Sequence, residues 1–125
     1  MKLIKLHVKT GNQKYPIFIG NNILNKLKSI LQDNLINFNQ CLVIVDKNVP
    51  KSLINKVLNS LSKKKISLHY FESSEKNKNQ KSIDIILSIL LSKNFNRNDC
   101  VISVGGGITG DVSGFAASIF KRGLK

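Results

Sequence analysis

The sequence predicts an α/β fold: a parallel sheet with flanking helices, preceded by an N-terminal antiparallel hairpin. Short apolar runs of strand length alternate with stretches whose apolar residues recur at helical spacing, as in parallel strands joined by helices. Residues 3–19 instead contain two β-rich runs separated by turn residues, which is typical of a hairpin. Near residue 105 a strand pattern gives way to consecutive glycines and then to a helical pattern.

The first elements are the hairpin and a short helix. Residues 3–8 and 15–19 are the expected hairpin strands. Residues 20–22, Gly-Asn-Asn, offer a helix cap, and the helix that follows should end before Asp33. Its apolar residues at helical spacing are Ile23, Leu24, Leu27, Ile30 and Leu31.

Residues 41–45 are continuously apolar, as expected of a central parallel strand that is covered on both faces. This strand ends at Asp46, and the carboxyl ends of strands are where open α/β sheets bind ligands. A helix-capping turn is an equally good interpretation of Asp46. Pro50 suits the first turn of the next helix. The apolar stripe of that helix comprises Leu53, Ile54, Val57, Leu58 and Leu61.

The second half repeats this alternation. Residues 66–71 predict a strand, residues 72–81 a polar loop, and residues 101–104 the strand that leads into the glycines. The helix between loop and strand should bury Ile83, Ile86, Leu87, Leu90 and Leu91.

The glycines from Gly105 onward end the last predicted strand and open a helix. Without Cβ atoms the backbone of such a turn can come close to a ligand, and the unpaired N–H groups of the helix suit a phosphate or another anion. Gly105, Gly107 and Gly110 fit the G-x-G-x-x-G dinucleotide pattern, which alone is a weak signal. A glycine turn with only a packing role is the alternative. The expected buried face of the helix comprises Ile108, Val112, Phe115 and Ile119.

Composition and charge argue against several classes of protein. With 125 residues the chain can form one domain, taken as residues 1–125. No apolar run approaches the roughly 20 residues of a membrane span, and residues 1–8 alternate instead of forming a signal peptide, so we expect a cytoplasmic protein without a membrane partner. The formal net charge of +13 comes almost entirely from dispersed lysines without interleaved aromatic residues, which favours a solvated basic surface over a nucleic-acid site.

Cysteine and histidine form neither a metal nor a disulfide pattern. Cys41 and Cys100 are far apart in the sequence, so reduced and partly buried thiols are expected. His7 and His69 lie in separate strand-like segments without short metal-ligand spacing, so neither is assigned a role.

The run from Gly105 to Gly123, GGGITGDVSGFAASIFKRG, resembles the signature of the 3-dehydroquinate synthase family, GGG-x-x-GD-x-x-GF-A-A followed by RG. Arg122 follows Asp111 by eleven residues, about three helical turns, which would place both on one helix face. In this signature Phe115 is expected to be buried. Small residues should let the helix lie close to its neighbours, namely Gly110, Gly114, Ala117 and Ser118.

The resemblance implies a Rossmann-like fold with an NAD site. Asp46 and Asn48 match the family's D-x-N segment, whose side chains lie beside the NAD adenosine. Glu75 and Lys78 match its G-E-x-x-K segment, which implies contact of the glutamate with the ribose hydroxyls, although Ser74 stands where the family usually has glycine. The residues implied to hold the pyrophosphate and nicotinamide half are Gly106, Gly107, Ile108, Thr109, Gly110 and Asp111.

The implied activity is a lyase step of the shikimate pathway. It converts 3-deoxy-D-arabino-heptulosonate 7-phosphate, a phosphorylated sugar acid, to 3-dehydroquinate and phosphate, with Arg122 helping to hold the substrate. NAD acts as a catalyst beside a divalent metal, zinc or cobalt, and the complete enzyme is expected to be a homodimer. The family's metal ligands lie in a second, helical domain that would follow Lys125. We therefore expect an N-terminal portion that does not catalyse the reaction alone.

Alternatives stay open at this point. Another sugar-phosphate cyclase would share this N-terminal signature. Glycerol and iron-dependent alcohol dehydrogenases share a triple-glycine turn but usually follow it with serine and D-x-x-K, whereas Gly110-Asp111 followed by Gly114-Phe115 favours the first family. A noncatalytic nucleotide-binding remnant or partner-dependent module is the alternative from outside the enzymes.

Overall fold

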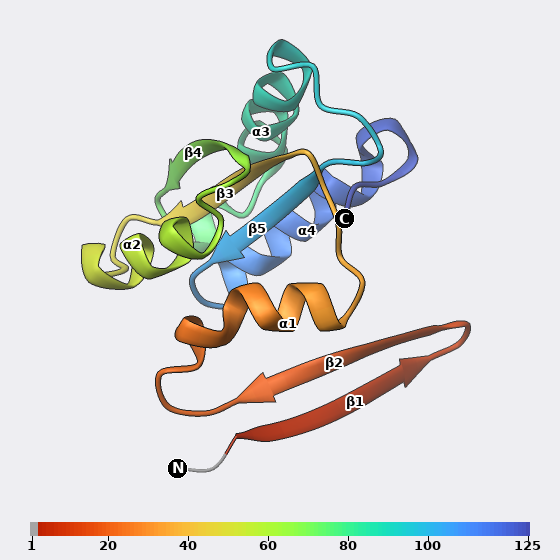
Figure 1. The fold of residues 1–125 in the computed structure, drawn as a ribbon. Helices are drawn as coiled ribbons and strands as arrows, with labels where there is room; N and C mark the ends of the chain where they lie inside the picture. Colours follow the sequence, from red (N-terminus) through yellow and green to blue (C-terminus); the bar gives the residue numbers. More distant parts are fainter. Residues whose placement is uncertain (1–2) are drawn as a thin grey trace.

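The computed structural model describes residues 3–125, apart from the side chain of Arg122, and consists of a hairpin and an α/β unit (Figure 1). The predicted α/β architecture with an N-terminal antiparallel hairpin is confirmed. In chain order the elements are β1 (Ile4–Thr10), β2 (Gln13–Ile19), η1 (Ile23–Lys26), α1 (Leu27–Asp33), β3 (Gln40–Asp46), α2 (Lys51–Ser60), β4 (Lys65–Phe71), η2 (Glu75–Asn77), α3 (Gln80–Ser92), β5 (Cys100–Val104), α4 (Gly107–Ile119) and η3 (Phe120–Arg122).

The apolar run at residues 41–45 forms the middle of β3, the central strand of a three-stranded sheet with the order β4-β3-β5. Both neighbours of β3 run parallel to it, from Gln40 opposite Lys65 in β4 and from Cys41 opposite Cys100 in β5. Neighbours on both sides and helices on both faces leave residues 41–45 with 0% exposure. Because all the strands run in one direction, their carboxyl ends meet at one edge of the sheet.

Helices cover both faces of this sheet (Figure 1). Leu42 and Ile44 pack with apolar residues of α3 and α4, whereas Cys41, Val43 and Val45 pack with α2 and with partly buried residues of α1. Successive side chains of a strand point to opposite faces, so one strand supplies both cores. The chain leaves β3 toward β4 and then returns across β3 to β5. This reversal makes the carboxyl edge between β3 and β5 a switch point, where open α/β sheets bind ligands.

The hairpin is a separate two-stranded sheet that lies beside α1 (Figure 1). Its register runs from Ile4 opposite Ile19 to Thr10 opposite Gln13, as the alternating pattern predicts. Gly11 adopts φ +53 in the turn, a conformation that glycine reaches without a Cβ clash. The hairpin therefore adds no strand to the three-stranded sheet.

Two apolar stripes are wider than the faces that the helices bury. Leu53 of α2 and Leu91 of α3 are 39% and 62% exposed, whereas the middle of each stripe is buried. The first helix also begins differently from the prediction, as the 3₁₀ turn η1. Asn22 before it has φ 55 and makes no side-chain cap hydrogen bond, so the predicted cap is wrong.

The predicted buried face of α4 is also wrong. Phe115 and Ile119 are 53% and 47% exposed. The helix instead turns a mostly small face to the sheet, with Thr109, Val112, Ser113, Ala116 and Ala117 buried. A helix that packs closely on a sheet accommodates small residues at the contact, so the large side chains are rotated outward.

The expectations for the small residues and for Arg122 were only partly right. Ala117 is buried, but Gly110, Gly114 and Ser118 are exposed. The helix ends at Ile119, and Lys121 has φ 43, so Arg122 belongs to the separate turn η3. The predicted common helix face for Asp111 and Arg122 therefore does not form.

Within residues 3–125, no helix is both long enough and apolar enough to span a membrane.

Candidate functional site at the carboxyl edge of the sheet

The glycine turn fits tightly between β3 and α4. A Cβ atom added to Gly105 would lie 3.0 Å from Cβ of Asp46 and 2.8 Å from Oγ1 of Thr109. These separations are shorter than normal contacts between such atoms, so the position requires glycine. In contrast, a Cβ atom on Gly106 or Gly107 would meet nothing within 4 Å. The space above these two glycines is therefore open to a ligand.

The N-terminus of α4 faces this open space. Gly106 is its N-cap residue and provides no side-chain cap, so the first N–H groups of the helix lack that partner. Thr109 in the first turn is fully buried, and its Oγ1 has no hydrogen-bond partner within the described residues. Unpaired N–H groups and the positive end of the helix dipole suit an anion at this point.

Asp46 ends β3 and forms a tight turn beside Gly105. Its Oδ1 accepts a hydrogen bond from the N–H of Asn48 at 3.0 Å, and its carbonyl accepts one from the N–H of Val49 at 3.0 Å. Asp46 therefore forms a side-chain-stabilised turn, but it does not cap a helix, because the N-cap of α2 is Pro50 and receives no side-chain hydrogen bond. The turn occupies one carboxylate oxygen of Asp46. Asn48, which lies in this turn after β3, is exposed.

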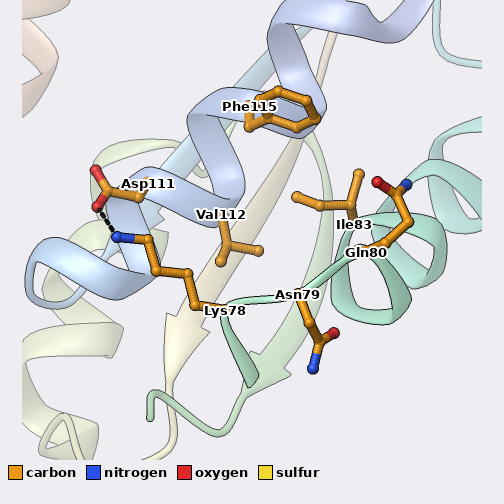
Figure 2. Close-up of a pocket in the computed structure, with 7 residues that line it drawn as sticks. All are labelled: Lys78, Asn79, Gln80, Ile83, Asp111, Val112 and Phe115. Atoms are coloured by element: carbon orange, nitrogen blue, oxygen red, sulfur yellow. Dashed lines mark ion pairs between the residues drawn. The ribbon is translucent and has the colours of Figure 1, made fainter. Parts of the chain in front are cut away.

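An ion pair connects the loop after β4 to the first turns of α4. Lys78 Nζ lies 3.1 Å from Asp111 Oδ2, and their side chains are 46% and 63% exposed (Figure 2). The hydrogen bond and charge of Asp111, with a further contribution from Glu75, raise the pKa of Lys78. Lys78 is therefore a cation paired with Asp111, with the negative charge of Glu75 nearby. The ion pair thus joins the loop that follows β4 to the helix that follows β5.

Ser74 does not distort the turn that precedes Glu75. It has φ −154 and ψ 158, an extended conformation that any residue adopts. A serine at this position is therefore compatible with the loop backbone. Its Oγ is buried without a hydrogen-bond partner in the part of the chain that the structure describes.

A cavity of about 400 Å³ opens beneath the ion pair, between α3 and α4 (Figure 2). Its lining combines polar and apolar side chains. Asn79 caps α3 by accepting a hydrogen bond from the N–H of Ser82 at 3.0 Å. The lining residues are Lys78, Asn79, Gln80, Ile83, Asp111, Val112 and Phe115. Sequence reasoning missed Asn79, Gln80 and Phe115 here, although an asparagine before an apolar helix is a recognisable cap signal.

This geometry leaves the role predicted for Arg122 untested, and it contains no metal site among the described residues. The side chain of Arg122 lies outside the described part of the structure, so its role as a substrate ligand stays a prediction. Among residues 3–125, no group of three or more His, Cys, Asp or Glu side chains is placed to hold a metal ion. The described residues do not fit a metal centre, and we assign no metal ligand to this chain.

The chain is similar to known proteins over its whole length. Residues 68–125 match the family model described as 3-dehydroquinate synthase N-terminal. The chain is 65% identical over 125 residues to the 3-dehydroquinate synthase of Pelagibacter ubique (strain HTCC1062), covering 100% of this chain and 34% of that protein. It thus spans about a third of the length of this curated relative.

Solved structures show the same fold. The crystal structure of 2-deoxy-scyllo-inosose synthase complexed with carbaglucose-6-phosphate, NAD+ and Co2+ matches 97% of this chain and 33% of that chain, with a TM-score of 0.85 and 23% identity. The 2-epi-5-epi-valiolone synthase ValA from Streptomyces hygroscopicus subsp. jinggangensis 5008, with NAD+ and Zn2+ bound, matches 79% of this chain and 28% of that chain, with a TM-score of 0.65 and 20% identity. In sequence, the chain corresponds to the N-terminal part of 3-dehydroquinate synthases, and the solved structures show that it shares the fold of the corresponding part of those two synthases.

Proposed function

We propose that this chain is the nucleotide-binding part of a 3-dehydroquinate synthase and that the carboxyl edge of its sheet binds NAD. The observation that carries the proposal is the convergence of three strand ends on one rim. Asp46 at the end of β3 abuts Gly105 after β5, and Lys78 after β4 pairs with Asp111 of α4 at 3.1 Å. A dinucleotide lying across a switch point needs polar groups from several strands at one edge.

The adenosine half would lie toward β3 and β4. Asp46, Asn48 and Glu75 offer carboxylate and amide groups there, and a carboxylate can accept hydrogen bonds from two neighbouring ribose hydroxyls. Lys78 would balance the negative charge that Glu75 and Asp111 bring to the rim. Asn48, Glu75 and Lys78 are exposed and Asp46 is half-buried, so each can contact a ligand.

The pyrophosphate and nicotinamide half would lie on the glycine turn. The N–H groups at the start of α4 suit the pyrophosphate, while Asp111, being anionic, would orient a hydroxyl or the nicotinamide. When bound, NAD supplies a hydride acceptor and donor. The remaining residues assigned to this half are Gly106, Gly107, Ile108, Thr109 and Gly110.

The finer expectations complete this proposal. The substrate is 3-deoxy-D-arabino-heptulosonate 7-phosphate, with Arg122 contributing to its phosphate site through paired guanidinium donors. The complete enzyme is a cytoplasmic homodimer that also uses zinc or cobalt. The 125-residue chain alone, without ligands for that metal, does not form dehydroquinate.

Calorimetric titration of the purified chain with NAD tests the proposed site. The Gly106→Val variant should weaken NAD binding by about tenfold or more, because the added side chain enters the space assigned to the pyrophosphate. Gly114→Val is the matched control, because a Cβ at either glycine meets nothing within 4 Å in this chain. Unchanged NAD affinity in Gly106→Val, or no binding by the parent chain, would contradict the proposed cofactor site.

The same titrations separate NAD binding from general attraction to a basic surface. The formal net charge of +13 would favour duplex DNA if charge alone governed binding. We expect NAD binding that changes little with salt and no specific duplex binding. Binding of duplex with a steep salt dependence, and none of NAD, would support a nucleic-acid function instead. Formation of dehydroquinate by the chain with added NAD and zinc would contradict the expected inactivity.

A further inference from the structure

We propose that a cavity between the ends of α1 and α2 binds a small organic anion, a carboxylate carried on an apolar body. Residues 36–38, which lead from α1 into β3, and residues 60–64, which lead from α2 into β4, line this cavity of about 240 Å³. Because β3 and β4 are parallel and begin opposite each other, both segments reach the sheet at its amino edge. The cavity therefore lies at the edge opposite to the proposed NAD site, and the proposal does not rest on that site.

Three lysines from separate parts of the chain line the cavity. Lys28 belongs to α1, whereas Lys63 and Lys64 follow α2. Within residues 3–125, no Asp or Glu lines the cavity and none of the three lysines forms an ion pair. Ammonium groups around one hollow repel one another and attract an anion. The fold thus brings lysines that are distant in the sequence to one place where an anion can neutralise them.

The most buried residues of the lining are apolar. Phe38 and Leu61 are 5% and 3% exposed, and Leu31 is half-buried. An apolar surface stabilises the apolar part of a ligand by removing it from water. A bare inorganic ion would gain nothing from these side chains. The lining therefore favours an anion with an apolar body over an inorganic anion.

The local structure after α1 explains how one apolar side of the cavity forms. The N–H of Leu35 donates to the carbonyl of Gln32 at 3.1 Å, and the N–H of Ile36 donates to the carbonyl of Leu31 at 3.0 Å. These two hydrogen bonds, with Leu35 at φ 57, are the Schellman motif that ends many helices. The motif turns the chain back on the helix, so Ile36 and Leu31 both line the cavity.

Hydrogen bonds hold the two sides of the cavity together. Lys64 Nζ donates to the carbonyl of Phe38 at 2.7 Å and lies 5.1 Å from the centre of the Phe38 ring. Ser60 Oγ donates to the carbonyl of Leu24 at 3.3 Å, which ties the end of α2 to η1. An ammonium group has three N–H donors, so Lys64 keeps two of them for a ligand. A side chain that is already held in place loses less conformational freedom on binding.

The size of the cavity limits the ligand to a small molecule. Pockets for drug-sized ligands have volumes of about 300–1,000 Å³, whereas this cavity has about 240 Å³. Benzoate meets the requirements of size and chemistry, because its ring can contact Phe38 and Leu61 while its carboxylate faces the lysines. Benzoate is therefore the probe for this site.

Titration of the chain with benzoate, followed by the backbone amide signals in NMR spectra, tests the site. We expect saturable shifts of the Leu61 and Lys63 signals and an affinity that falls with added salt. Acetate carries the charge without the ring, and benzyl alcohol carries the ring without the charge. Each should bind about tenfold or more weakly than benzoate.

Two variants separate the charged and apolar contributions. Lys63→Met removes one charge and keeps an unbranched side chain, and it should weaken benzoate binding about threefold. Ile36→Ser removes apolar surface at a residue that is 36% exposed, so the chain should stay folded while benzoate binds about threefold or more weakly. The matched control is Lys93→Met, which removes the same charge from the end of α3 and does not line the cavity. Its affinity for benzoate should equal that of the parent chain.

Three outcomes would overturn the proposal. The first is the absence of benzoate-induced shifts at Leu61 and Lys63. The second is binding of acetate or inorganic phosphate as tight as that of benzoate, which would show general attraction of anions to a basic surface. The third is equal weakening in Lys63→Met and Lys93→Met, which would show that net charge and not the cavity governs binding.

Discussion

Asp46 ends β3 and Gly105 follows β5, yet the Cβ of Asp46 lies 3.0 Å from the place that a Cβ of Gly105 would take. The contact is possible because β3 and β5 are parallel neighbours whose last paired residues, Val45 and Val104, stand opposite each other. This contact fixes the start of the glycine turn against the end of the central strand β3.

The Gly105→Ala variant should be less stable than the parent chain. Its methyl group would lie 2.8 Å from the buried Thr109 Oγ1, so either α4 or the end of β3 must move. Overpacking of this kind costs about 1–3 kcal/mol of the free energy of unfolding, which urea titration can measure. Gly106→Ala is the control, with a change within about 0.5 kcal/mol. Equal stability of the two variants would contradict the tight fit at Gly105.

The Asp111→Asn variant should lower the pKa of Lys78. The hydrogen bond and negative charge of Asp111 raise that pKa, and neutralising the carboxylate removes most of this effect. A pH titration of the Lys78 side chain by NMR measures the change, whereas the melting temperature should hardly move because the pair is exposed. Asp84→Asn on α3, which changes a carboxylate bonded to Gln80, should leave Lys78 unaffected. An unchanged Lys78 pKa in Asp111→Asn would mean that the ion pair is absent in solution.

Stability should fall with decreasing pH partly because of His69. Partial burial in β4 lowers the pKa of His69, so the unfolded chain binds a proton more readily than the folded chain. The neutral imidazole therefore makes its full contribution to the free energy of unfolding above about pH 6.5. That contribution is lost as the pH falls toward the pKa of His69 in the folded chain. Urea midpoints at pH 8 and pH 5.5 should differ less in His69→Gln than in the parent chain. The control is His7→Gln, which changes a histidine on the exposed hairpin. If the urea midpoint falls equally between pH 8 and pH 5.5 in the parent chain and both variants, His69 is not the source of the pH dependence.

The two thiols should be unreactive in the folded chain. Cys41 and Cys100 stand opposite each other on β3 and β5 and are 0% and 4% exposed. Contact with the Cys100 thiol and burial both raise the pKa of Cys41, which keeps that thiol neutral. Dithionitrobenzoate should therefore modify the cysteines at the rate of unfolding, and rapidly in urea. Fast modification under native conditions would show that this part of the sheet opens.

Local patterns were sufficient to predict most elements. The apolar run at residues 41–45, the turn around Gly11 and the helical spacing after Pro50 depend on neighbouring residues, so the hairpin, the strands and the α/β alternation followed from them. The expected ligand edge also followed, because parallel strands bring their carboxyl ends together. The family motifs then identified which polar residues at those ends to examine.

Packing decided what these patterns could not. Phe115 and Ile119 looked like core residues of α4, but closeness to β5 left room only for small side chains on that face. Asp99 received no assignment from the sequence, yet its buried carboxylate accepts hydrogen bonds from Gln40 and Asn96, because the strand order places the starts of β3 and β5 together. The amino acids themselves therefore determined the elements, the reduced cysteines and the polar character of the strand ends. Which side chains meet, as in Asp46 with Gly105 or Lys78 with Asp111, was decided only by the tertiary structure, because such contacts depend on strand order and helix rotation across the whole sheet.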